Sequence, residues 1–157
     1  MVKINIITVG SLKEKYLREA VAEYQKRLSR FATVKVTELS EAYLPQNPSP
    51  ADIDRALEKE ADGILKQFSS GAHIALCVEG KQYSSEGFSR LIEQSAMSGA
   101  IDFVIGSSHG LSDRVKQACS CRLSFSEMTF PHQLMRVMLI EQIYRAFKIS
   151  HGENYHK

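Results

Sequence analysis

The stretch IDFVIGSSHG, residues 101–110, indicates the fold of this chain most directly. Its first half, Ile101 to Ile105, is a short run that is apolar except at Asp102, which predicts a strand buried on both faces. Such strands occur in parallel sheets whose crossover helices cover both sides. Its second half is a loop of small residues, which lets a ligand approach the backbone and receive amide hydrogens. A tight turn that simply requires glycine is the alternative interpretation of this loop.

Strands and helices alternate along the rest of the chain. The apolar patterns predict strands at residues 3–9, 33–39, 73–78, 101–105 and 122–125, with a turn at Gly80-Lys81. They predict helices at residues 14–29, 50–68, 112–118 and 132–150, and a further helix that begins after Ser84 or Ser85. Ser49 and Pro50 suit the start of the 50–68 helix. This order predicts an α/β fold with a mainly parallel sheet flanked by helices.

The composition is that of a small globular protein. The chain has 157 residues, of which 43% are hydrophobic, so we expect one domain, residues 1–157, around one core. No apolar run is long enough to span a bilayer, and no signal peptide is recognisable, so the sequence predicts a cytoplasmic protein without membrane contact. The net charge of +2 is compatible with a polyanionic partner but does not demonstrate one.

Several common kinds of site are disfavoured by the sequence. The three cysteines, Cys77, Cys119 and Cys121, predict reduced thiols, and no second pair of ligands stands at zinc spacing, so we expect no metal. The first glycine loop, at Gly10, lacks the dinucleotide fingerprint, and Gly80-Lys81 lacks the rest of a P-loop. The carboxylates are too scattered for a metal-dependent nuclease or hydrolase.

The helix at residues 132–150 is the most informative segment. Apolar side chains surround Arg136, and a guanidinium in such a place needs a partner, because an unpaired buried charge is very costly. A structural ion pair and a contact with an anion or RNA both remain open. Glu141 is expected to pair with Arg145, four residues later. Apolar residues nearly encircle the helix, which indicates either a homodimer interface or a helix at the centre of the monomer.

These blocks resemble the RlmH family of ribosomal RNA large-subunit pseudouridine methyltransferases. The resemblance covers essentially the whole chain, and its most specific part begins at Phe130. The matching stretches are Val9-Gly10, residues 76–81 (LCVEGK) with 84–86 (SSE), Ile105-Gly106, 130–136 (FPHQLMR), 141–146 (EQIYRA) and 154–157 (NYHK). The resemblance implies a SPOUT-type α/β fold with a C-terminal trefoil knot, assembled as a homodimer. It also implies methylation of ring nitrogen 3 of a pseudouridine in 23S rRNA on the assembled ribosome, with S-adenosylmethionine (SAM) as donor.

The resemblance also implies particular site residues. The methyl donor would be bound by Leu76, Gly106, Ser107, Gly110, Ser126, Glu127, Met128, Thr129, Phe130 and Pro131. The catalytic group would comprise His132, Arg136, Tyr155 and His156, with one of the titratable rings as the base. RNA would be held by Arg136, Arg145 and Lys157.

Two residues depart from the family pattern. Ser107 stands where the family usually has a second glycine, and its side chain is in a position to crowd the donor. Asn154 replaces a proline before the terminal tyrosine, which loosens the tail because the fixed dihedral of proline is lost. If Ser107 abolishes donor binding, the alternative function is a non-catalytic module that binds RNA or the ribosome with the same fold.

Overall fold

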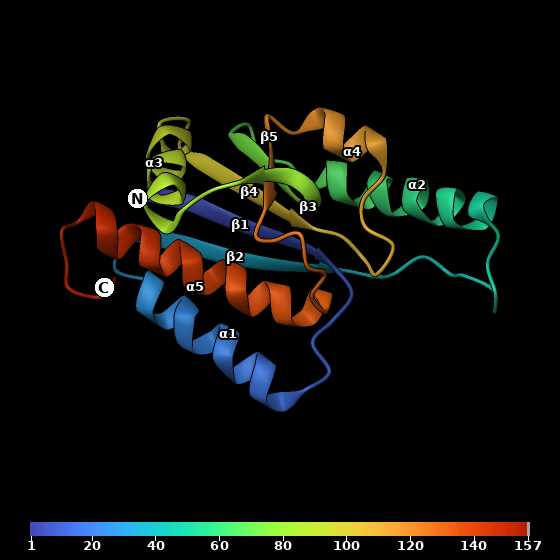
Figure 1. The fold of residues 1–157 in the computed structure, drawn as a ribbon, viewed down its shortest axis with the longest axis horizontal. Coiled ribbons are helices and arrows are strands. Elements are labelled where there is room, and N and C mark those ends of the chain that lie inside the picture. Colours follow the sequence, from blue (N-terminus) through green and yellow to red (C-terminus); the bar gives the residue numbers. More distant parts are fainter. Residues whose placement is uncertain (157) are drawn as a thin grey trace.

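Five parallel strands form one sheet in the order β2-β1-β4-β3-β5 (Figure 1). The computed structural model describes residues 1–156. The strands are β1 (Val2–Val9), β2 (Ala32–Leu39), β3 (Ala72–Gln82), β4 (Ala100–Ile105) and β5 (Cys121–Ser124). The helices are α1 (Lys15–Leu28), α2 (Pro50–Lys66), α3 (Ser85–Ala96), α4 (Asp113–Ala118) and α5 (His132–Ser150). The predicted α/β fold with a mainly parallel sheet is confirmed.

Helices cover both faces of the sheet, and each face has its own core. In β1, Ile4 and Ile6 belong to the core beneath α1, α3 and α5, whereas Ile7 and Val9 belong to the core beneath α2 and α4. This division follows from the alternation of side chains along a strand. Figure 1 shows α5 beside α1 on one face and α4 near α2 on the other. Every residue of β4 is buried, as its largely apolar run predicts, and this includes Asp102.

Most helix boundaries follow the predicted signals. The Ser49 hydroxyl accepts from Asp52 N–H at 3.1 Å, and the Asp52 carboxylate accepts from Ser49 N–H at 2.9 Å, which completes a capping box at the start of α2. Ser84, rather than Ser85, caps α3 by accepting from Gly87 N–H. Among residues 1–156, no helix combines the length and apolarity needed to cross a membrane.

The predicted turn at Gly80-Lys81 is wrong, because β3 continues through these residues to Gln82. Leu76 and Lys81 both pair with Leu123 of β5, so the residues between them form an irregular bend within the strand. Glycine is needed there for a close approach to β5. A Cβ at Gly80 would lie 2.6 Å from the carbonyl oxygen of Arg122, which is backbone and cannot move aside cheaply.

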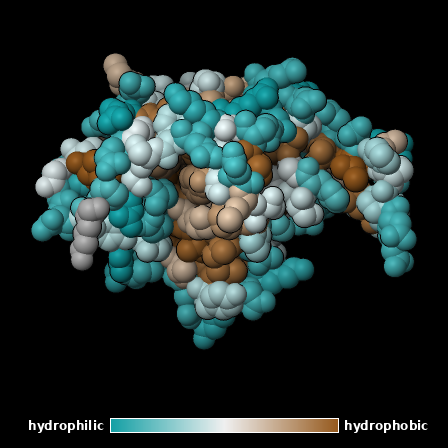
Figure 2. Space-filling model, viewed as in Figure 1, coloured by the Kyte–Doolittle hydropathy of each residue, from teal (hydrophilic) through white to brown (hydrophobic). Residues whose placement is uncertain are grey.

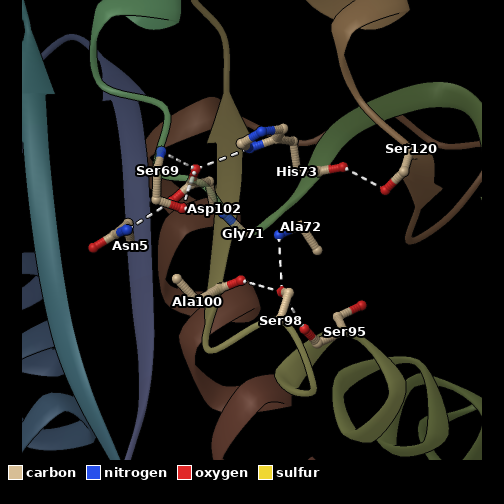
Figure 3. Close-up of polar contacts among 10 residues, drawn as sticks. All are labelled: Asn5, Ser69, Gly71, Ala72, His73, Ser95, Ser98, Ala100, Asp102 and Ser120. Carbon is tan, nitrogen blue, oxygen red and sulfur yellow. Dashed lines mark hydrogen bonds and ion pairs between the residues drawn. The ribbon is translucent and has the colours of Figure 1, made fainter.

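A buried carboxylate, Asp102, joins three strands near their amino-terminal ends, and Figure 3 shows the side chains around it. Its Oδ1 accepts from Asn5 Nδ2 at 2.6 Å, and its Oδ2 accepts from the N–H and hydroxyl of Ser69. Oδ2 also lies 2.9 Å from His73 Nδ1, and the His73 ring stacks on Phe68. These contacts satisfy the carboxylate and tie β1, β3 and β4 together.

Candidate active site

A cavity of about 600 Å³ opens beside the bend of β3, where β4 and β5 end. The carboxyl ends of parallel strands are the usual place for ligands in α/β sheets, and the volume is typical of small-molecule sites. The wall is formed by the bend of β3, by the loops that follow β4 and β5, and by the first turn of α5. The lining residues outside the predicted set include Cys77, Val78, Glu79, His109, Lys116 and Met135.

The donor-binding residues implied by the family resemblance come together here, with one exception. Glu127 is exposed and does not line the cavity. The others do: Leu76, Gly106, Ser107, Gly110, Ser126, Met128, Thr129, Phe130 and Pro131. His132, which was placed in the catalytic group, lines the same cavity. One space is thus bounded by residues from three separate segments of the chain.

The loop at residues 106–110 is a tight turn, and it also lines the cavity. Gly110 N–H donates to the Ser107 carbonyl at 2.9 Å, and Gly110 has a φ of +86°, which favours glycine. A Cβ at Gly106 would lie 2.2 Å from the Gly110 carbonyl oxygen. The backbone can therefore close on itself only if residue 106 is glycine.

The hydroxyl of Ser107 is held by a residue outside the cavity. It donates to Glu60 Oε1 at 2.9 Å, and the second oxygen of Glu60 accepts from Ala42 N–H at 2.9 Å. Glu60 lies on the buried side of α2 between Ala56 and Ile64. The sequence offered a signal for this residue, because a carboxylate at helical spacing within an apolar stripe requires partners.

The segment that leads into α5 forms the opposite wall. Ser126 organises it, since its hydroxyl accepts from Met128 N–H at 3.0 Å while its carbonyl accepts from the Ser124 hydroxyl. The helix begins after Pro131 without a side-chain cap. Several N–H groups of the first turn are therefore free of helical partners, and the positive end of the helix dipole lies at the cavity wall.

One ion pair lies on the cavity wall. Lys116 Nζ is 2.6 Å from Glu79 Oε1. The hydrogen bond from Lys116 lowers the pKa of Glu79, and the same bond raises the pKa of Lys116, so both groups are charged at neutral pH. Sequence reasoning missed this pair. The two residues are 37 positions apart, and no local pattern joins them.

Burial determines the state of two cysteines in this part of the molecule. Burial raises the pKa of Cys77 to about 11 and that of Cys119 to about 12, so both thiols are protonated at neutral pH. All three cysteines are free. Within residues 1–156, no group of three or more histidine, cysteine or acidic side chains is arranged to hold a metal ion.

Arg136 lies beneath the cavity wall rather than on it. Its side chain is 3% exposed; Nη1 donates to Glu38 Oε2 at 2.6 Å and Nη2 donates to the Gly10 carbonyl at 3.1 Å. Burial acts to raise the pKa of Glu38, but hydrogen bonds from Arg136 and from Leu12 N–H outweigh it, and the net pKa is lowered. Of the two open alternatives, the structure shows the ion pair.

The described part of the C-terminal tail, which ends at His156, folds back onto α5 and α3 and does not line the cavity of its own chain. The Tyr155 hydroxyl donates to Glu141 Oε1 at 3.2 Å. His156 contacts Arg145 through Nδ1 at 3.1 Å and Glu86 through Nε2 at 2.9 Å. The structure thus separates Tyr155 and His156 from His132. Lys157, predicted to contact RNA, lies outside the described residues.

The same contacts define the state of Tyr155 and Arg145. Burial, followed by Tyr24 and the charge of Glu141, raises the pKa of Tyr155 to about 12. The phenol is therefore protonated at neutral pH and can donate a hydrogen bond but cannot accept a proton. The predicted pair of Glu141 and Arg145 is confirmed, with Nη2 2.6 Å from Oε1. This guanidinium also lies over the Tyr155 ring.

A second, more apolar cavity of about 420 Å³ lies between α3 and α5. Figure 2 shows hydrophobic residues gathered in the middle of this face of the molecule, over α5. Within α5, only Leu134 and Ser150 are exposed, and all the other residues are buried or partly buried. The cavity is lined by Tyr24, Tyr83, Ser84, Ser85, Phe88, Leu123, Phe125, Val137, Met138, Glu141 and Gln142.

Comparisons with known proteins agree on one family. Residues 2–156 match the model of a family described as predicted SPOUT methyltransferase. The chain is 49% identical over 158 residues to ribosomal RNA large subunit methyltransferase H of Streptococcus uberis, with 99% of each chain covered. It is 50% identical over 157 residues to the protein of that name from Bacillus pumilus, covering 98% of this chain and 99% of the relative.

A solved structure extends the comparison to the fold. It comes from Legionella pneumophila, is assigned as a methyltransferase and contains the bound cofactor SAM. The TM-score is 0.53 at 12% identity, and the alignment covers 93% of this chain and 66% of that chain. At this identity the likeness bears on the fold alone.

Proposed function

Because the chain belongs to the SPOUT methyltransferase family, and within it to the RlmH group, we propose that it methylates a pseudouridine of 23S rRNA at ring nitrogen 3. The donor in this proposal is SAM, and the substrate is the assembled ribosome in the cytoplasm. One observation carries the proposal: nearly all the donor-binding residues implied by the family resemblance line a single cavity beside the bend of β3, at the carboxyl ends of β4 and β5.

The donor would be held mainly by backbone groups. Gly106 allows the loop after β4 to close on itself, Gly110 leaves open space beside it, and the segment 126–131 also lines the cavity. When bound, SAM supplies a methyl group on a positively charged sulfur. The Ser107 hydroxyl is engaged by Glu60, which supports retention of the donor site despite the departure from the family pattern.

His132 is the residue that we assign as the general base. The imide nitrogen of pseudouridine must lose its proton before or during methyl transfer, and histidine is the side chain suited to accept one near neutral pH. His132 lines the cavity, and its Nε2 lies 3.9 Å from Glu41 Oε1. Tyr155 is assigned the role of a donor, because its phenol stays protonated.

A second copy of the chain completes the site in this proposal. The apolar cavity between α3 and α5 is available for a partner, and the tail carrying Tyr155 and His156 lies beside α5. In a homodimer, the tail of one subunit would reach the cavity of the other and bring Tyr155 and His156 near His132. Arg145 would then present its charge to the RNA, while Arg136 would position the loop at Gly10 through its contact with that carbonyl.

The test is transfer of a labelled methyl group from SAM to ribosomes that lack this modification, followed by mapping of the methylated nucleotide. His132→Ala should reduce the rate by roughly 100-fold or more, because general-base catalysis contributes about that much. His151→Ala is the matched control, since His151 packs on Phe31 away from the cavity.

Three results would contradict parts of the proposal. Full activity of His132→Ala would remove the assigned base. Equal methylation of free rRNA and of ribosomes would refute recognition of the assembled particle. Absence of SAM binding in calorimetry would favour the alternative function, a non-catalytic ribosome-binding module.

A further inference from the structure

Glu60 is a buried carboxylate that the proposed reaction does not use. It is 8% exposed, and each of its oxygens accepts one hydrogen bond: Oε1 from the Ser107 hydroxyl and Oε2 from Ala42 N–H, both at 2.9 Å. A buried carboxylate is stable only when donors of this kind meet it. Glu60 thereby joins two segments that lie 47 and 18 positions away in the chain.

The two segments lie on different sides of the candidate active site. Ser107 belongs to the loop that lines the donor cavity. Ala42 directly follows Glu41, whose carboxylate is 3.9 Å from His132. Gly10 leaves room for Glu41, because a Cβ at Gly10 would lie 2.9 Å from Glu41 Oε1. A continuous line of contacts therefore runs from the donor loop through Glu60 to the proposed base.

We propose that Glu60 is a positioning residue that couples occupancy of the donor loop to the segment at residues 40–44, so that donor binding fixes Glu41 beside His132. This inference rests on the proposed function, because the ligand that occupies the loop is SAM. The Ser107 turn is closed by the bond from Gly110 N–H, so a displacement of the loop moves the hydroxyl with it. Because Glu60 also accepts from Ala42 N–H, movement of the Ser107 hydroxyl shifts Glu60 and, with it, Ala42.

A purely structural role for Glu60 has different consequences. If the carboxylate only satisfies Ala42 N–H, then substitutions change stability, while the exchange of that amide with solvent is independent of SAM. Coupling instead requires that SAM slow the opening of the bond between Ala42 and Glu60. Couplings between two sites commonly amount to about 5- to 150-fold in affinity, which an exchange experiment resolves.

The experiment measures hydrogen exchange at the Ala42 amide in the full chain, with and without SAM at a concentration that saturates each variant by calorimetry. In the wild type, SAM should slow this exchange about fivefold or more. Ser107→Ala should reduce the effect to less than about twofold, because the hydroxyl link is gone. Glu60→Gln should retain it, since the amide oxygen accepts from Ala42 while its NH₂ donates to Ser107.

Glu58→Gln is the matched control, because Glu58 lies on the same helix but is exposed and pairs with Arg114. It should behave as the wild type does. If SAM binds the wild type but leaves exchange at Ala42 unchanged, or if Ser107→Ala keeps full protection, the coupling is refuted while the proposed function stands. If SAM does not bind the wild type at all, the donor assignment fails and this inference fails with it.

Discussion

Arg136 and Glu38 form an ion pair across 98 positions of the chain, with 2.6 Å between Nη1 and Oε2. The pair holds the loop that follows β1 at two points, because Arg136 donates to the Gly10 carbonyl and Glu38 accepts from Leu12 N–H. The arginine is almost fully buried, whereas the Glu38 side chain is 44% exposed. Loss of Glu38 would leave a buried charge without its partner, whereas loss of Arg136 would leave a carboxylate that water can reach. The two losses should therefore differ in their effect on stability.

Glu38→Gln should lower the free energy of unfolding by about 1–3 kcal/mol, because it leaves the Arg136 charge buried opposite a neutral group. Urea denaturation at pH 7 measures this change. Glu23→Gln is the matched control, since Glu23 and Arg27 form an exposed pair on α1 whose loss should cost at most about 1 kcal/mol. Equal effects of the two substitutions would show that the buried pair contributes no more than a surface one.

The same pair predicts a dependence of stability on pH. The folded-state pKa of Glu38 is lowered from 4.5, so its contribution is fully present above that value and is lost as the pH falls through the lowered folded-state pKa. Stability should fall less steeply below about pH 4.5 in Glu38→Gln than in the wild type. Parallel curves for the two proteins would contradict this contribution.

Tyr155→Phe should leave the shape of the pH–rate profile between about pH 6 and 9 unchanged, because the phenol is protonated throughout that range. The rate should fall by no more than about tenfold, which corresponds to the loss of a single hydrogen bond such as the one to Glu141. Methyl transfer measured across the pH range checks both points. If the pH–rate profile of this variant lost its dependence on pH on one side of the optimum, Tyr155 would be identified as the base.

Gly106→Ala should weaken SAM binding by more than about tenfold, because the added Cβ would meet the Gly110 carbonyl at 2.2 Å and force the donor loop open. Calorimetry measures the dissociation constant. Gly63→Ala, within α2, is the control. Its Cβ would make only ordinary contact with Leu39, and it should stabilise the fold by about 0.5–1 kcal/mol without changing SAM binding.

Met138→Lys should convert the proposed dimer into a monomer, because it places a charge in the apolar cavity between α3 and α5. Light scattering during gel filtration measures the mass. Met97→Lys is the control, since Met97 is 89% exposed at the end of α3 and should leave the mass unchanged. A wild-type protein that elutes as a monomer would itself refute the dimer, and with it the shared active site.

Local patterns predicted the fold well, because periodicity and caps are properties of neighbouring residues. The bounds of α5 and the buried character of β4 follow directly from the sequence. The continuation of β3 through Gly80 does not, because the reason for that glycine is the backbone of β5, 42 positions later. A glycine suggests a turn unless the opposing strand is known.

The candidate site was predictable only where residues adjoin a strand end. The loop after β4 was identified by its small residues, and the family resemblance supplied the segment before α5. The pair of Glu79 and Lys116 and the contacts of Glu60 depend on tertiary packing between distant segments. The partner of Arg136 was left open for the same reason, since Glu38 stands at the far end of another strand.

The placement of β5 also bears on how the protein is made. Synthesis proceeds from the amino terminus, so β3 forms an unpaired edge of the sheet until β5 has emerged and docked beside it. An exposed sheet edge promotes aggregation because it can pair with strands of other chains, whereas short edge strands that carry charge resist such pairing. β5 has only four residues and includes the exposed Arg122. The segment whose loop supplies one wall of the donor cavity therefore also covers the β3 edge of the nascent chain.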